Sequence, residues 1–171
     1  MHAFDMSIPV GHWVDTEAEA SEWLKYFIKS SKTSGSLGID TETTGLDILR
    51  DRVVVWSLSD GIQRICMPEK FLQMYKEPLL ENPSVNYDGT RIKFDAHMIA
   101  NMGVDLSKAG SWCDTIPQSW LKNENNIGGH GLKECILEYF NRVTPSFTET
   151  FGKVPPKKKD KLTGRVISRT V

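Results

Sequence analysis

A short apolar run that ends in two alternating acids constrains this chain more than any other feature. Leu37 and Ile39 lead into Asp40, and Glu42 follows just before a glycine-containing turn. Side chains two apart on a strand point to the same face, so the segment 37–43 is predicted to be a buried strand with both carboxylates side by side. Like charges this close repel. A fold keeps such a pair only where something offsets that cost.

Length and composition restrict the class of protein. A chain of 171 residues with a net charge of −1 is long enough for one well-buried domain and too short for two ordinary ones. A nucleic-acid partner would therefore meet a local basic surface, because the chain as a whole is not basic. Its 3 cysteines, Cys66, Cys113 and Cys135, form no C-x-x-C pair. This pattern argues against a disulfide scaffold or a thiolate zinc site and favours a reducing compartment.

The order of helix-like and strand-like segments predicts the fold class. Thr16 and Glu19 have capping-box spacing at the start of an amphipathic pattern, and Asp60-Gly61 indicates a hairpin. We expect helices at 16–29, 69–80, 94–103, 115–122 and 131–140, strands at 37–43, 52–60, 62–67 and 84–89, and a loop at 31–36. This order is typical of an α/β protein with a mixed sheet and helices on its faces. We find no signal peptide and no apolar run long enough to cross a bilayer, and we expect a cytoplasmic protein without a membrane partner.

A third acid adds to the strand pair. Asp95 follows Lys93 and Phe94 at the start of the predicted helix 94–103. Taken singly, each feature has an ordinary explanation: acids at strand ends are often solvated, and the helix dipole favours an acid in the first turn. Three carboxylates that converge from a strand and a helix start would suit a hard divalent cation. A pair of such ions is the usual means of hydrolysing a phosphodiester without a covalent intermediate.

The segment "GIDTETTGL", residues 38–46, resembles the first motif of the DEDD superfamily of 3′–5′ exonucleases, which have a ribonuclease H-like fold. "IKFDAHMIANMGVDL", "CDTIPQSWLKNE" and "HGLKECILEYF" are similar to the second motif and the helices after it. The series resembles the proofreading exonuclease domain of family A DNA polymerases, the DNA polymerase I type, phage versions included. The resemblance implies an RNase H-like α/β fold.

The same resemblance implies a set of functional residues. Asp40, Glu42 and Asp95 match three of the four acids that are catalytic and that bind Mg²⁺ or Mn²⁺, with two ions in a complete domain. Thr43 matches a position facing the terminal nucleotide, and Leu46 matches an apolar residue that packs on the 3′-terminal base. Arg91 and Lys93 are assigned to nucleic-acid contact. The implied substrate is the single-stranded 3′ end of DNA, and the implied role is proofreading during replication in a bacterium, or in a host cell if the chain is phage-encoded.

Two departures from the family pattern matter. Arg91 occupies a position that is Asn in many relatives, which changes the charge near the acids. The third motif, Tyr-x-x-x-Asp or His-x-x-x-x-Asp, does not occur after His130. The resemblance therefore predicts a domain that is incomplete at its C-terminus. A polymerase domain or a second fragment would be the partner that supplies the missing motif.

The domain boundaries follow from these motifs. We expect a helical lead-in over 1–34, the exonuclease domain over 35–150 and a basic tail over 151–171. The tail is either a solvated basic loop or a phosphate-contacting flap beside a nucleic-acid groove, and "PPKKKDK" is a weak match to a nuclear-import signal. Its cationic residues are Lys153, Lys157, Lys158, Lys159, Lys161, Arg165 and Arg169.

Other polar residues have ordinary explanations. We expect Asp114 to cap the helix that follows it, with a metal role as the alternative, and we expect structural or capping roles for His97 and His130. Asp47 and Asp51 flank a turn and are expected to be solvated. Two other functions remain open. One is a catalytically incomplete remnant that binds nucleic-acid ends, and the other is a phosphatase with an acid after a strand, which would not need the T-T-G-L turn or the K-F-D helix.

Overall fold

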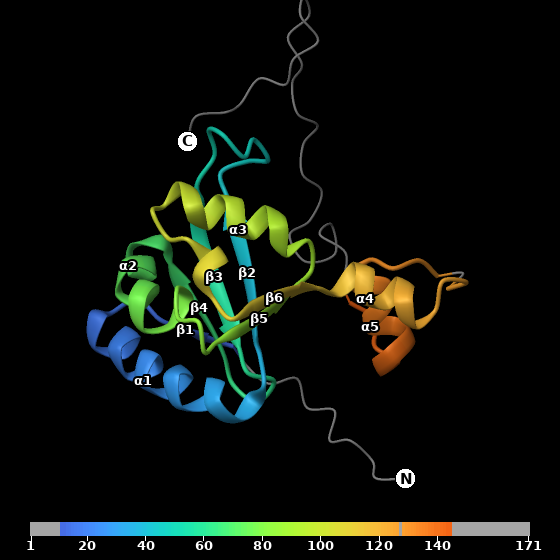
Figure 1. Ribbon diagram of the computed structural model, residues 1–171, viewed down its shortest axis with the longest axis horizontal. Coiled ribbons are helices and arrows are strands. Elements are labelled where there is room, and N and C mark those ends of the chain that lie inside the picture. The colour runs from blue at the N-terminus through green and yellow to red at the C-terminus, as the bar shows by residue number, and fades with distance from the viewer. Residues whose placement is uncertain (1–10, 127, 145–171) are drawn as a thin grey trace, which may run out of the picture. The chain divides into compact units, whose positions relative to one another are not determined.

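Strand β2 (Leu37–Thr43) pairs on both sides inside a six-stranded mixed sheet with the order β1-β4-β3-β2-β5-β6. The structure is a computed structural model that describes residues 11–126 and 128–144 (Figure 1). β2 is antiparallel to β3 and parallel to β5, and β4 continues the antiparallel part. The other strands are β1 (His12–Trp13), β3 (Val53–Ser59), β4 (Arg64–Pro68), β5 (Asn86–Gly89) and β6 (Ser111–Asp114). The predicted mixed α/β sheet is confirmed.

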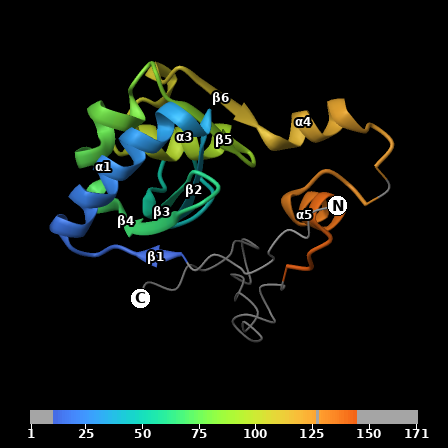
Figure 2. The same ribbon diagram turned by 90° about the horizontal axis from the view of Figure 1, so that it is seen from below.

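Three helices pack on one face of this sheet, as Figures 1 and 2 show: α1 (Glu17–Ser34), α2 (Leu72–Tyr75) and α3 (Ile92–Asn101). Trp56 of β3 points to this face, and its ring meets the ring of Tyr75 edge to face at 5.0 Å. The Tyr75 hydroxyl in turn donates to the carbonyl of Ala20 in α1 at 2.7 Å. Alternate residues of β2 and β4 are buried, as are Val53, Trp56 and Leu58 of β3, and the residues between them are more exposed.

Helix α1 is longer than the sequence predicted. Its N-cap is Thr16, whose Oγ1 accepts the N–H of Glu19 at 3.3 Å as expected. The segment 31–36, predicted to be a loop, is helical as far as Ser34, and Gly35 ends the helix with φ +82°. The hydroxyl of Thr33 donates to the carbonyl three residues earlier. The hydroxyls of Tyr26 and Ser30 donate to Asp60 in the β3–β4 hairpin. That tertiary contact favours helix where the composition favours a loop.

The predicted helix 69–80 is helical but irregular. A 3₁₀ turn at Glu69–Phe71 precedes α2, and a wider π turn at Lys76–Leu80 follows it. Pro78 lies in that last turn. Proline lacks the N–H that an α-helix needs in its interior, and the N–H of Glu81 reaches back five residues to the carbonyl of Lys76 at 2.7 Å. A helical periodicity alone does not reveal this change of hydrogen-bond pattern.

Two strands were not predicted. β1 pairs with β4 through two residues, and β6 pairs in parallel with β5 over the register Asn86↔Ser111 to Gly89↔Asp114. Both lie at the edges of the sheet. Short polar edge strands carry little periodic signal, because their pairing is decided by a partner far away in the sequence.

The turn from β5 into α3 has unusual backbone geometry. A Cβ on Gly89 would lie 3.0 Å from the carbonyl oxygen of Ile39, so glycine permits the close approach of β5 to β2. Two residues on, Arg91 adopts the left-handed conformation at φ 59° and ψ 35°. Its N–H donates to Asp114 Oδ1 at 3.1 Å, which ties this turn to the end of β6.

The predicted helices near 115–122 and 131–140 are present as α4 (Thr115–Lys122) and α5 (Leu132–Phe140). The chain divides into two compact units, Met1–Leu132 and Lys133–Val171. In the second unit, Leu137 and Phe140 of α5 are exposed. No helix in the described ranges has the length and apolarity needed to cross a bilayer. The basic tail lies outside the described residues, and the boundaries at 34/35 and 150/151 stay a prediction.

The left-handed turn predicts a stability order at position 91. This conformation costs L-residues other than Asn, Asp and Gly about 1–2 kcal/mol. We expect Arg91→Asn to stabilise the fold by roughly 0.5–1 kcal/mol and Arg91→Val to destabilise it by about 1 kcal/mol, since a β-branched side chain tolerates this region least. Urea unfolding of the three chains would measure the order. Equal stabilities would mean that Arg91 does not hold this conformation in solution.

Candidate active site

Asp40 and Glu42 lie on the face of the sheet opposite to the helices. In β2, Leu37, Ile39 and Thr41 are buried, whereas Asp40 and Glu42 are exposed. Asp40 is opposite Ser57 of β3, which is opposite Cys66 of β4. Burial raises the pKa of the Cys66 thiol, and the charges of Asp40 and Glu42 raise it further. The two acids are therefore close to each other on one face of the sheet, as the spacing predicted.

Asp95 reaches the edge of the same strand from the first turn of α3. Its side chain is buried, and its Oδ1 accepts the N–H of Thr41 at 3.0 Å and the hydroxyl of Thr41 at 2.5 Å. β5 pairs with β2 only at Leu37 and Gly38. Beyond Gly38, the Thr41 N–H meets the Asp95 carboxylate instead of a strand. The three acids thus approach the edge of β2 from two sides, because Thr41 points to the helix face and its two neighbours point away.

The acids affect one another electrostatically. Desolvation, followed by the charges of Asp95 and Glu42, raises the pKa of the Asp40 carboxyl to about 6. Burial also raises the pKa of Asp95, and the hydrogen bonds from Thr41 oppose that rise. None of the ion pairs among residues 11–126 and 128–144 involves Asp40, Glu42 or Asp95. This part of the chain therefore has a concentration of negative charge without a protein cation paired to it.

The donor set fits a hard divalent cation in its chemistry. Carboxylate oxygens are the ligands that Mg²⁺ and Mn²⁺ prefer, and a cation would relieve the repulsion that raises the pKa of Asp40. Within the described ranges, however, no three His, Cys, Asp or Glu side chains are gathered closely enough to hold a metal. One oxygen of Asp95 is engaged by Thr41. Asp40 and Glu42 are thus the two carboxylates that β2 offers at this edge, and Asp95 is the one from α3.

The loop after β2, residues 44–52, is held by its own hydrogen bonds. Asp51 accepts the Thr44 hydroxyl and the Asp47 N–H, both at 2.8 Å, and a Cβ on Gly45 would clash with its carboxylate. The Asn101 amide of α3 donates to the carbonyls of Ile48 and Asp51 at 2.9 and 3.0 Å. Asp51, expected to be merely solvated, thus organises the loop. The alternating acids of the sequence motif did not predict this role for Asp51 or for Asn101.

This ordered loop displays apolar side chains. Leu46 is 85% exposed, on the strand-to-loop segment that begins directly after the two acids. Single exposed apolar side chains are common on protein surfaces, so this exposure leaves Leu46 accessible to a partner without identifying one. The Thr43 hydroxyl donates to the Gly45 carbonyl at 2.6 Å, so in this structure it shapes the turn.

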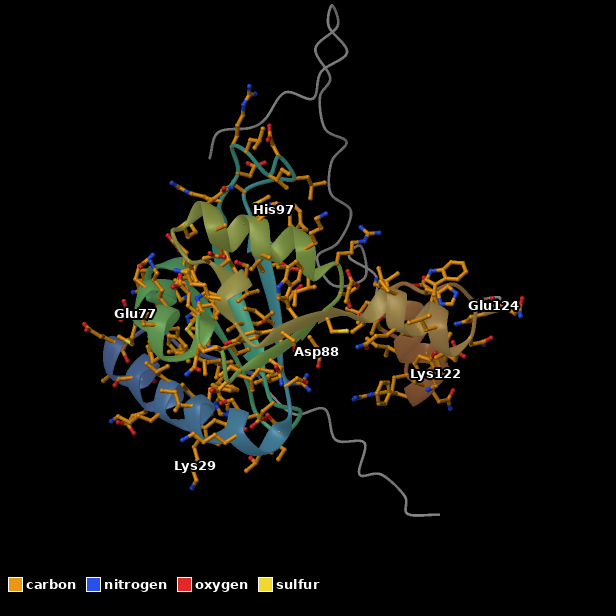
Figure 3. All side chains as sticks on the ribbon, in the orientation of Figure 1. Lys29, Glu77, Asp88, His97, Lys122 and Glu124 are labelled. Carbon is orange, nitrogen blue, oxygen red and sulfur yellow. The ribbon has the colours of Figure 1, made fainter. Side chains whose placement is uncertain are left out.

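The remaining candidates divide between exposed and structural positions. Arg91 and Lys93 are exposed at the start of α3, and so is His97, labelled in Figure 3. Asp114 caps α4, because its Oδ1 accepts the N–H of Ile116 at 2.9 Å as well as that of Arg91, and its charge raises the pKa of Asp95. His130 is buried. Its Nδ1 lies 2.9 Å from Ser119 Oγ, and its ring stacks on Trp120 at 3.9 Å. The capping role of Asp114 and a structural role for His130 are thus what the contacts show.

Known structures share this fold. The chain is similar to Brucella melitensis NrnC, with 20% identity over 81% of this chain and 64% of that chain and a TM-score of 0.56. It is also similar to Escherichia coli RNase D, described as an exoribonuclease involved in structured RNA processing, with 13% identity over 80% of this chain and 35% of that one and a TM-score of 0.62. Pol1 of M. smegmatis, solved with a DNA primer-template, has 14% identity over 80% and 23% of the chains and a TM-score of 0.58.

These likenesses establish the fold, and the chain spans about two thirds or less of the length of these three structures. The predicted ribonuclease H-like architecture is confirmed. A sequence model described as 3′-5′ exonuclease matches residues 12–163, most of the chain and all three acids. The match confirms the family predicted from the motif at 38–46. This protein belongs to the 3′–5′ exonuclease family found in family A DNA polymerases.

Proposed function

We propose that this chain removes nucleotides from the 3′ end of single-stranded DNA by divalent-metal-dependent hydrolysis, as a proofreading domain or as a fragment of one. The observation that carries the proposal is the approach of Asp40, Glu42 and Asp95 to the edge of β2 without a paired protein cation. Structures of Brucella melitensis NrnC with bound Mg²⁺ and bound to pGG support a metal and a nucleic-acid substrate by analogy.

Each residue then has a role in binding or orientation. Asp40, Glu42 and Asp95 would hold Mg²⁺ or Mn²⁺, with two ions in a site that also has the fourth family acid. A bound divalent ion lowers the pKa of its water and stabilises charge on the attacking and leaving oxygens. The exposed cations Arg91 and Lys93 would contact phosphate oxygens. Leu46 and the Thr43 turn would meet the terminal nucleotide.

The second candidate function is a nucleic-acid-binding subunit that needs a partner for catalysis. One observation favours it: the described residues hold no preassembled group of three metal-binding side chains. A polymerase domain or another fragment would then supply the fourth acid. Each missing positioning or electrostatic element typically costs orders of magnitude in rate.

An activity assay separates these two functions. We expect Asp40→Asn and Glu42→Gln to abolish any Mg²⁺- or Mn²⁺-dependent release of nucleotides from 5′-labelled single-stranded DNA, because each substitution removes a ligand charge. The control variant Glu22→Gln removes an exposed α1 carboxylate that pairs with Lys25, and it should keep full activity. Parallel assays on single-stranded RNA test the substrate preference.

Each outcome of the activity assay has a definite meaning. Full activity in Asp40→Asn would contradict the assignment of the acids. A wild-type chain that binds 3′ ends but degrades neither DNA nor RNA would support the second candidate function. Addition of a polypeptide that carries a Tyr-x-x-x-Asp helix should then restore degradation.

The raised pKa of Asp40 predicts a pH-dependent stability difference. The unfolded carboxyl titrates near 3.8 and the folded one near 6, so between these values the folded state binds more protons, and this group destabilises the fold as the pH rises. In a chelator, Asp40→Asn should melt at the same temperature as the wild type below about pH 4 and at a higher temperature above pH 6. Thermal unfolding across this range measures the difference. A constant difference at all pH values would show that the pKa of Asp40 is not raised in the folded state.

Leu46 provides a test of end recognition. We expect Leu46→Ala to weaken binding to single-stranded 3′ ends by about 1–3 kcal/mol, the value of one lost contact with a base, and to leave binding to internal duplex unchanged. Ile62→Ala is the control, because it truncates an exposed apolar side chain at the far end of β3. Fluorescence anisotropy with a labelled single strand and a hairpin-capped duplex measures both. Equal losses on the two substrates would point to a structural role for Leu46.

A further inference from the structure

Thr41 makes two hydrogen bonds to one carboxylate oxygen. Its backbone N–H and its hydroxyl both donate to Asp95 Oδ1, at 3.0 and 2.5 Å. Thr41 is 9% exposed and Asp95 is 3% exposed. Both bonds thus lie where water competes poorly and where a hydrogen bond to a charged group is strong. They leave the second oxygen, Oδ2, outside this pair of bonds.

The two bonds serve different purposes. The backbone N–H needs an acceptor whatever the side chain is, because β5 stops pairing with β2 at Gly38 and a buried N–H without a partner is costly. The hydroxyl has no such necessity: a valine of the same shape would fill the space under α3 and leave the backbone bond in place. A second donor to the same oxygen adds orientation, since two bonds from different directions fix the rotation of the carboxylate.

We propose that Thr41 is a positioning residue, whose hydroxyl fixes the Asp95 carboxylate at the edge of β2 so that Oδ2 is presented to the cation held with Asp40 and Glu42. This inference rests on the proposed function, because it assigns Asp95 to a metal. Because side chains alternate between the two faces of β2, three consecutive residues of this strand contribute to the arrangement. The residue between the two acids points to the opposite face and there orients the third acid.

Metal binding in the absence of substrate tests this role without depending on activity. The full chain is titrated with Mn²⁺, and free Mn²⁺ is measured by electron paramagnetic resonance. We expect Thr41→Val, which removes the hydroxyl and keeps the shape, to weaken Mn²⁺ binding about 10-fold or more, the usual effect of losing a partner that orients a ligand. Thr41→Ser retains the hydroxyl and should bind Mn²⁺ close to the wild-type affinity.

A matched core variant separates orientation from stability. Ile99→Val removes one methylene from a fully buried residue on the same helix as Asp95 and leaves the carboxyl groups of all three acids in place. It should lower the melting temperature and leave the Mn²⁺ affinity unchanged. If Thr41→Val does not fold, as judged by circular dichroism, Thr41→Ala takes its place, because it removes the hydroxyl without adding volume.

A double-mutant cycle adds a readout that a purely structural residue would not move. If Thr41 acts through Asp95, Thr41→Val should reduce Mn²⁺ affinity much less in an Asp95→Asn background than in the wild type. Equal affinities of Thr41→Val and the wild type, or equal weakening by Thr41→Ser and Thr41→Val, would overturn the inference and leave the proposed function intact. A wild-type chain without measurable Mn²⁺ binding would instead contradict the proposed function, and the inference with it.

Discussion

The hydrogen bonds between Thr41 and Asp95 join the two parts of the sequence on which the site depends. Strand β2 lies inside the sheet, but its pairing with β5 ends at Gly38, and within the described residues no other strand continues on that side. The Asp95 carboxylate takes that place and accepts the N–H that a neighbouring strand would have bound. The same contact therefore satisfies the backbone N–H of Thr41, fixes the first turn of α3 against the sheet and brings a third acid to the edge where two others already lie.

The turn that precedes α3 makes this contact feasible. Gly89 allows β5 to approach Ile39 closely, and Arg91 takes a left-handed conformation that directs the chain into the helix. Asp114 at the end of β6 accepts the Arg91 N–H and caps α4. The Asn found in many relatives at this position tolerates left-handed geometry well. Arg91 therefore adds a positive charge at the cost of some backbone strain. In the proposed function, a phosphate oxygen would bind that charge.

Burial and mutual repulsion both act on the acids at the edge of β2. The charges of Asp95 and Glu42 help to raise the pKa of Asp40, and the described residues hold no tight group of three metal-binding side chains. Acids held together in this way destabilise the fold, and a ligand of opposite charge would relieve that destabilisation. The loop at 44–52 follows the two acids in the sequence, and Asp51 and Asn101 fix its backbone while Leu46 stays exposed.

The amino-acid sequence by itself determined the strand at 37–43, the shared face of Asp40 and Glu42, the β3–β4 hairpin and the family, because these features are local: a period of two, a turn dipeptide and a contiguous motif. It also predicted Asp95 as the third acid from its motif. Only the tertiary structure decided that α1 continues to Ser34, that β1 and β6 join the sheet and that Pro78 lies in a π turn. It alone showed the contacts of Thr41, Asp51 and Asn101. Thr41 and Asn101 bind partners that are distant in the sequence, and Asp51 forms hydrogen bonds that close a loop, so no periodic pattern predicts these contacts.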